Sequence, residues 1–171
     1  MKREKKNPEI GRGRNKLDSS NTEYYFAYGS NMDESKLKIK RNVDFYEKFS
    51  GKIDGWEIVF DKMAFGKPGV AYSNISPKEN SCVEGIVYKI KSEDVLNKLD
   101  RDEGWPKHYE KKYMSVKTAN GFLECLVYVA NPNQTQNGLK PERKYLDEIL
   151  AGRKFLSDSY YSELKDTPTC D

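Results

Sequence analysis

The sequence predicts an α+β domain with five or six strands and three or four helices, in which hairpins dominate. The clearest observation is the dipeptide Asn120-Gly121 between two apolar runs, because this pair is the strongest short signal for a β-hairpin. Alternating apolar residues over Cys82–Ile90 have the period of two that is typical of a strand. The length of 171 residues indicates one domain with a core that needs no disulfide or metal.

The first half of the chain contains three predicted strands and one short helix. Aromatic residues favour the half-buried surface of a sheet and predict a strand over Tyr24–Tyr28. A short helix with a strongly basic second half is expected over Asp33–Arg41. Extended chain is predicted over Val43–Phe60, and a short strand over Val70–Ile75.

Helices and strands then alternate in the second half. After the strand Cys82–Ile90, Ser92 is a good N-cap for a helix that we expect to run to about Asp102. Pro141 suits the first turn of a later helix, and Phe155–Leu164 is expected to form another.

The predicted hairpin joins Glu110–Thr118 to Phe122–Ala130. A two-residue loop of Asn120-Gly121 would place Tyr113 opposite Tyr128. The second strand is apolar on both faces over most of its length, which predicts a central strand covered on both sides.

Residues 1–22 differ in composition from the rest of the chain. They hold seven Lys or Arg and three Asp or Glu, a net charge of +4, whereas the remainder has a net charge of −1. Without apolar periodicity, this segment is expected to be a disordered basic tail, with residues 23–171 as the folded domain. A solubilising extension is preferred over a nucleic-acid-binding role, because the domain has no basic stripe for phosphates.

The chain has no run of 18 apolar residues, and its basic N-terminus lacks the apolar segment of a secretory signal. We therefore expect a cytoplasmic protein without membrane contact. Cys82, Cys125 and Cys170 form no CxxC pair, so reduced thiols are expected rather than a zinc site or disulfides.

The most informative stretch is Tyr25–Met32, where an aromatic strand breaks into a small polar turn. Gly29 allows backbone conformations that are closed to residues with a Cβ atom. The amides of Gly29, Ser30 and Asn31 would be left unpaired by a helix that begins near Asp33, and such a loop can hold a carboxylate or an oxyanion. A simple strand-to-helix connection is the alternative interpretation.

A second segment, Leu99–Trp105, ends a predicted helix on three acidic residues. Asp100 and Asp102 are interpreted as a solvated helix end. Glu103 is the candidate proton carrier, because Trp105 would desolvate its carboxylate and raise its pKa toward that of a general base.

These two segments together resemble the γ-glutamylcyclotransferase-like superfamily. Its members carry a YGSN loop after the first strand and a catalytic Glu in a later "LD…EG" segment, here Tyr28–Asn31 and Glu103. The resemblance runs from about residue 24 to residue 161 and includes Gly85–Tyr88 and Leu126–Tyr128.

The resemblance implies a sheet closed into a small barrel and an intramolecular acyl transfer that releases 5-oxoproline. Glu103 would act as general acid and base, and no metal, cofactor or enzyme nucleophile would be needed. The substrate, a small γ-glutamyl amide, would contact Tyr28, Gly29, Ser30, Asn31, Tyr109 and Tyr128. Tyr128 is equally well explained as a core aromatic residue.

Other chemistries lack their residues. A Ser or Cys nucleophile normally needs a neighbouring base, and the only histidine is His108, which is interpreted as a surface residue. The sequence has no H-E-x-x-H, P-loop or nucleophile-elbow motif.

Three questions stay open at this point. The leaving group could be an amino acid, the ε-amine of lysine or an amine on a larger metabolite. A ligand-binding module that has lost turnover is the alternative to an enzyme, and a nucleic-acid-associated protein rests only on the tail. The oligomeric state is not predicted.

Overall fold

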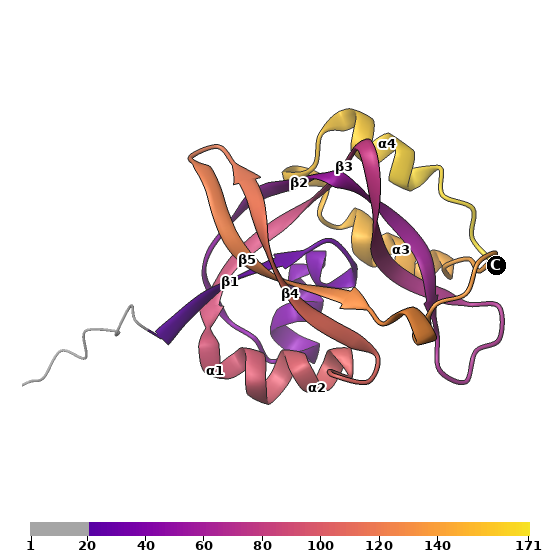
Figure 1. The fold of residues 1–171 in the computed structure, drawn as a ribbon, viewed down its shortest axis with the longest axis horizontal. Helices are drawn as coiled ribbons and strands as arrows, with labels where there is room; N and C mark the ends of the chain where they lie inside the picture. Colours follow the sequence, from indigo (N-terminus) through magenta and orange to yellow (C-terminus); the bar gives the residue numbers. More distant parts are fainter. Residues whose placement is uncertain (1–20) are drawn as a thin grey trace, which may run out of the picture.

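The computed structural model describes residues 21–171, in which five strands form a closed barrel (Figure 1). Around the barrel the strands follow the order β1-β3-β2-β4-β5. Only the contact of β1 with β5 is parallel, and it closes the barrel; the other neighbours are antiparallel. The strands are β1 (Thr22–Ala27), β2 (Phe45–Met63), β3 (Ala71–Lys91), β4 (Tyr109–Thr118) and β5 (Gly121–Ala130). The expected α+β fold with a small mixed barrel is confirmed.

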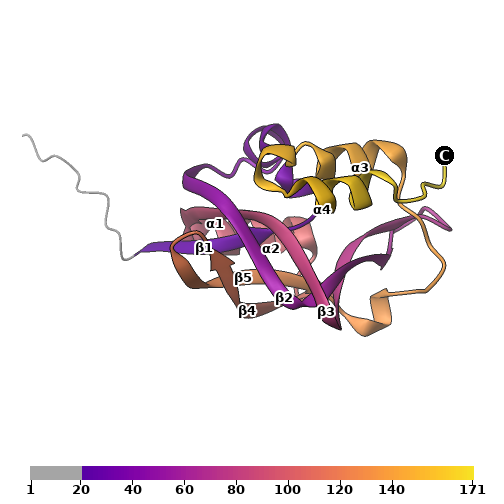
Figure 2. The same cartoon turned by 90° about the horizontal axis from the view of Figure 1, so that it is seen from above.

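Helical segments connect and cover the strands. Figure 2 shows α3 (Arg143–Leu150) and α4 (Asp158–Lys165) together on one side of the barrel. α1 (Ser92–Asp94) continues through a wide π-helical turn into α2 (Asp100–Glu103). Short helical turns lie at Ser30–Met32, Lys36–Lys40, Pro132–Gln134 and Arg153–Phe155. Within residues 21–171, no helix has the length and apolar character needed to span a membrane.

Side chains that alternate along the strands build two apolar cores. One draws on strand residues, among them Phe26, Val87 and Val127, and on Tyr28 just after β1, and it fills the barrel. The other packs the opposite faces of the same strands against the helices, with Leu99 and Ile149 among its members. β5 contributes to both cores, so its doubly apolar pattern correctly predicts a strand covered on both sides.

The separate strands expected at Val70–Ile75 and Cys82–Ile90 are one strand, β3. It pairs with β2 over most of its length, with irregularities in register. The residues between the two predicted strands, 76–81, are mostly exposed and polar, so no period of two identifies them.

The hairpin between β4 and β5 also differs from its predicted register. Its loop is Ala119-Asn120, one residue earlier than expected, and Tyr113 therefore pairs with Leu126 rather than Tyr128. Thr118 Oγ1 accepts a hydrogen bond from the Asn120 amide at 3.2 Å and donates one to the carbonyl of the following glycine at 2.7 Å. That glycine has a φ of +107° and is already the first residue of β5.

Element boundaries at the two ends of the domain shift by a few residues. Residues 1–20, which make up most of the expected disordered tail, lie outside the residues that the structure describes. Thr22, the last residue of that expected tail, already belongs to β1. α3 begins after Pro141 with Glu142 as its N-cap. α4 begins at Asp158, because Ser157 caps it by accepting the Tyr160 amide.

Candidate active site

A cavity of about 430 Å³ lies where the end of β1 meets α2, β4, β5 and α3. Every residue that the sequence and the resemblance suggested for the site lines this cavity: Tyr28, Gly29, Ser30, Asn31, Glu103, Tyr109 and Tyr128. The volume falls in the range of small-molecule sites, about 300–1,000 Å³.

The loop after β1 forms a tight turn whose first amides face no protein acceptor. The Met32 amide donates to the Gly29 carbonyl at 3.0 Å, which begins the turn at Ser30–Met32. In the described part of the chain, the amides of Gly29, Ser30 and Asn31 have no backbone or side-chain acceptor. These three donors are available to an anionic group in the cavity.

Gly29 is required by a close approach and not by an unusual φ, which corrects the reason given from the sequence. Its φ of −109° is open to any residue. A Cβ atom at this position would clash with Oγ of Ser73 on β3. The glycine therefore allows β3 to pack directly against the loop.

Asn31 joins the loop to the candidate acid. The residue is buried, with 3% of its surface exposed. Its Nδ2 donates to the Tyr25 hydroxyl at 2.9 Å and to Oε1 of Glu103 at 3.2 Å. Its carbonyl accepts a hydrogen bond from the Tyr88 hydroxyl at 3.1 Å. The structure therefore brings the loop and Glu103, 72 positions apart, into direct contact.

The pKa of Glu103 is raised above the ordinary value of 4.5, chiefly because burial disfavours the carboxylate. Arg41 and Lys36 lower this pKa, Asp102 raises it, and the hydrogen bond from Asn31 lowers it. Desolvation outweighs the two cations, so the carboxyl group holds its proton more tightly than a glutamate in water. Such a group is suited to exchange protons with a bound ligand.

Trp105 does not supply this desolvation, contrary to the expectation from the sequence. Its ring is 43% exposed and does not line the cavity. Instead, it lies under the Lys111 ammonium, which is 4.1 Å from the ring centre. Six tyrosines line the cavity together with Glu103, including Tyr25, Tyr128 and Tyr145.

Asp100 and Asp102 are not a solvated helix end, which corrects a second expectation. Asp100 is 5% exposed and accepts hydrogen bonds from the Tyr128 hydroxyl at 2.6 Å and from Lys111 at 2.8 Å. Asp102 lies 3.6 Å from a terminal nitrogen of Arg41. The sequence could not indicate these partners, because both come from distant elements.

Three tyrosine hydroxyls in the wall donate to protein acceptors. Tyr28 donates to the carbonyl of Tyr128 at 2.6 Å, and Tyr109 donates to the carbonyl of Ser73 at 3.1 Å. The third is Tyr128, whose acceptor is Asp100. Burial raises the pKa of each hydroxyl, so all three stay protonated. They shape the cavity and its polarity.

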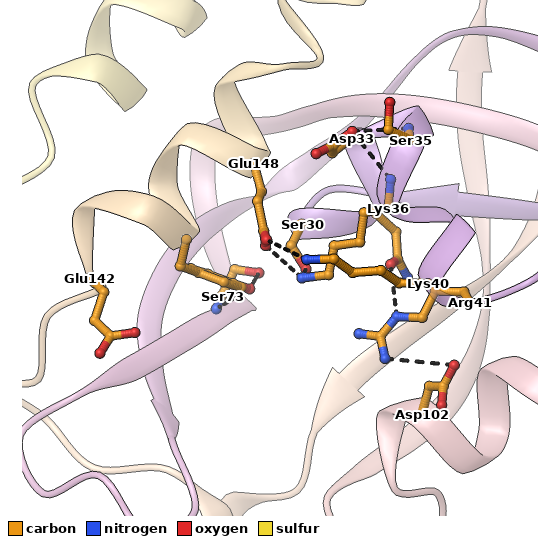
Figure 3. Close-up of polar contacts among 12 residues, drawn as sticks. Ser30, Asp33, Ser35, Lys36, Lys40, Arg41, Ser73, Asp102, Glu142 and Glu148 are labelled. Atoms are coloured by element: carbon orange, nitrogen blue, oxygen red, sulfur yellow. Dashed lines mark hydrogen bonds and ion pairs between the residues drawn. The ribbon is translucent and has the colours of Figure 1, made fainter. Parts of the chain in front are cut away.

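A cluster of cations beside the loop was not identified from the sequence. Figure 3 shows Lys36 and Lys40 pointing toward Glu148 of α3, and Arg41 pointing toward Asp102 of α2. Lys36 lies 2.5 Å from Glu148 and donates to Ser30 Oγ at 2.9 Å. The basic second half of the segment 33–41 was the available signal, but it does not tell which side chains face a cavity.

His108, interpreted from the sequence as a surface residue, is partly buried and lines the cavity. Its Nδ1 lies 2.9 Å from Oε1 of Gln134. Gly104, with a φ of +68°, has no room for a Cβ atom beside the imidazole.

Among residues 21–171, no three His, Cys, Asp or Glu side chains are arranged to hold a metal ion. Cys82, Cys125 and Cys170 are free thiols.

Solved structures with the same fold include a gamma-glutamyl cyclotransferase, with a TM-score of 0.76, 21% identity and coverage of 88% of this chain and 90% of that one. An uncharacterized protein from Homo sapiens has a TM-score of 0.76 and 23% identity, with coverage of 88% and 90%. YkqA from Bacillus subtilis has a TM-score of 0.75 and 23% identity, with coverage of 87% of this chain and 56% of its own. These similarities establish the fold. No curated protein matches the chain by sequence.

The model of the family described as "Gamma-glutamyl cyclotransferase, AIG2-like" matches residues 25–147, a span that contains the loop, Glu103 and every other residue that lines the cavity. The chain therefore belongs to the gamma-glutamyl cyclotransferase, AIG2-like family.

Proposed function

We propose that this protein is a cofactor-independent cyclotransferase that cleaves γ-glutamyl amides and releases 5-oxoproline. The observation that carries the proposal is the contact between Asn31 Nδ2 and Glu103 Oε1, 3.2 Å apart. It joins a carboxyl group of raised pKa to a loop with free amides inside one cavity. Membership of the gamma-glutamyl cyclotransferase, AIG2-like family supports the same reaction.

The reaction begins with the substrate's own α-ammonium group, whose reference pKa is about 8. Glu103, in its ionised form, takes a proton from this group. The free amine then attacks the γ-carbonyl carbon and closes a five-membered lactam. Because nucleophile and carbonyl belong to one molecule, holding them in a reactive orientation replaces a bimolecular encounter.

The substrate is held by the loop. The amides of Gly29, Ser30 and Asn31 bind its α-carboxylate or the oxyanion that develops on the γ-carbonyl oxygen. Collapse of the tetrahedral intermediate breaks the bond to the leaving nitrogen. Protonated Glu103 returns its proton to that nitrogen, and the ring nitrogen gives its second proton to the departing amine, so the products are 5-oxoproline and the leaving amine in its ammonium form.

The raised pKa of Glu103 serves both halves of this cycle. A carboxylate with an ordinary pKa is a weak base toward an ammonium group, and desolvation makes it a stronger one. Arg41 and Lys36 oppose this effect, because their positive charges favour the ionised form.

The experiment is incubation of the purified protein with a panel of γ-glutamyl amides that differ in the leaving amine. We expect 5-oxoproline and the amine to appear in equal amounts, and Glu103→Gln to abolish both while it still binds substrate. Binding without release of 5-oxoproline from any compound would reject the proposal and support the ligand-binding module instead.

A further inference from the structure

Lys62 is a buried cation in the cavity wall that the proposed mechanism does not use. Only 4% of the residue is exposed, and it lies near the end of β2, where it pairs with Tyr72 of β3. Its ammonium donates to the backbone carbonyl of Met63 at 2.7 Å and lies 5.7 Å from the centre of the Tyr109 ring. Lys62 therefore brings a positive charge to a site that water reaches poorly.

The other two largely buried cations of the cavity are already neutralised. Lys36 lies 2.5 Å from Glu148, and Arg41 lies 3.6 Å from Asp102. For Lys62, residues 21–171 supply no carboxylate at ion-pair distance, and Glu103 acts on it only from farther away. A buried ammonium group without a counter-charge is costly, so an anionic ligand would be favoured beside it.

A chain of contacts through Ser73 and Tyr109 links the loop to Lys62. Ser73 packs against Gly29 of the loop, and its carbonyl accepts the Tyr109 hydroxyl at 3.1 Å. The ring of Tyr109 in turn faces the Lys62 ammonium. The cavity lining thus offers two kinds of partner for negative charge, the loop amides and the Lys62 ammonium.

We propose that Lys62 binds an anionic group on the leaving amine, and so selects γ-glutamyl amides of amino acids over those of uncharged amines. This inference rests on the proposed function. A γ-glutamyl amino acid has two carboxylates: the loop amides bind the one on the glutamyl part, and Lys62 binds the other. An uncharged leaving amine would leave the Lys62 ammonium buried and unpaired.

The test compares γ-glutamyl-alanine with γ-glutamyl-alaninamide, which differ only in the charge of the leaving group. Wild-type protein should prefer the free carboxylate by about 10-fold to 100-fold in kcat/KM, as expected for a hydrogen bond to a charged group. Lys62→Met should remove this preference while keeping turnover of the alaninamide. The exposed Lys67, which pairs with Glu142, offers Lys67→Met as a charge-matched control that keeps the preference.

Two results would overturn the role of Lys62: no preference in the wild-type protein, or an equal loss for both compounds in Lys62→Met. The second result would indicate that Lys62 contacts the γ-glutamyl part of the substrate, which the two compounds share. Thermal unfolding reports whether Lys62→Met folds. If Lys62→Met does not fold, the same comparison is made with Lys62→Gln. The absence of a preference in the wild-type protein rejects the role of Lys62 in either case.

Calorimetric binding to Glu103→Gln separates this inference from the proposed function. A preference for the free carboxylate that disappears in Glu103→Gln/Lys62→Met supports Lys62 as the anion site even when the wild-type protein releases no 5-oxoproline. That combination would reject only the cyclotransferase activity. Equal kcat/KM for the two compounds would support the activity and reject the role of Lys62.

Discussion

The two ends of α2 carry carboxyl groups in opposite surroundings. At its start, Asp100 is fully compensated, because a lysine ammonium and a tyrosine hydroxyl both donate to it. At its end, Glu103 accepts a hydrogen bond, among residues 21–171, only from the neutral amide of Asn31, and burial raises its pKa. Asp102 lies between them with two arginines, Arg41 and Arg101, as ion-pair partners. Of these three acidic residues, Asp100 and Asp102 therefore stabilise the structure, and Glu103 is free to exchange a proton.

This difference teaches that burial alone does not make a carboxyl group functional. Asp100 is buried, with 5% of its surface exposed, but its charge is satisfied by Lys111 on β4. Glu103 has cations nearby without a direct ion pair, and its surroundings favour the protonated form. The predictions below test this division.

The largest effect is expected for Glu103→Gln compared with Asp102→Asn. The amide of Gln keeps the volume of the side chain but cannot accept the ammonium proton. Loss of a positioned acid–base group costs about 10²–10⁴-fold in rate, whereas Asp102→Asn should leave most of the release of 5-oxoproline intact. Initial rates measure both. Equal losses would indicate that the negative potential of the helix end matters rather than one carboxyl group.

Asp100→Asn should reduce stability rather than chemistry. It leaves the Lys111 ammonium with a neutral partner in a mostly buried position, and we expect unfolding free energy to fall by about 1–3 kcal/mol. Asp102→Asn is the matched control, since its longer ion pair should contribute about 0–1 kcal/mol. Urea denaturation of both variants measures the difference. Similar losses for the two would show that Asp100 is not the structural partner described above.

Gly29→Ala tests the packing between the loop and β3. The added methyl group meets Ser73 Oγ, and overpacking of this kind typically costs about 1–3 kcal/mol. Ser73→Ala removes the opposing oxygen, so the double variant should recover part of the loss. Thermal unfolding of the single and double variants measures this coupling. Purely additive losses would mean that Gly29 is needed for another reason.

The smallest effect is expected for deletion of residues 1–20. This segment has almost no apolar surface to bury, so the melting temperature should stay the same. A large drop in melting temperature would show that the segment packs against the domain.

The sequence predicted the local elements better than the contacts between them. The aromatic strand β1 and the β4–β5 hairpin follow from propensity and turn residues that act over a few positions. The helix expected after Ser92 begins at that residue, but its N-cap is Lys91 and no side chain caps it, so the predicted capping role of Ser92 is wrong. The hairpin register was wrong by one loop residue, because the glycine can begin a strand as well as end a loop.

The parts of the candidate site that belong to a sequence motif could be predicted. The parts that come together only in the folded structure could not. The loop and Glu103 were found through their family pattern. Asp100 was misjudged because its partners Tyr128 and Lys111 lie on strands that the sequence does not pair with α2. The charged contributions of Lys36 and Lys62 were missed for the same reason: a lysine in a sequence does not indicate whether it faces water or a cavity.

The most direct test of the central claim is the titration of the Glu103 carboxyl group itself. Protein with ¹³C-labelled glutamate can be followed by NMR as the pH is raised, and Glu103→Gln identifies the resonance of residue 103. We predict a midpoint above the ordinary glutamate value of 4.5, because burial favours the protonated form of this side chain. A midpoint at or below 4.5 would contradict the assignment of Glu103 as the proton carrier of the site.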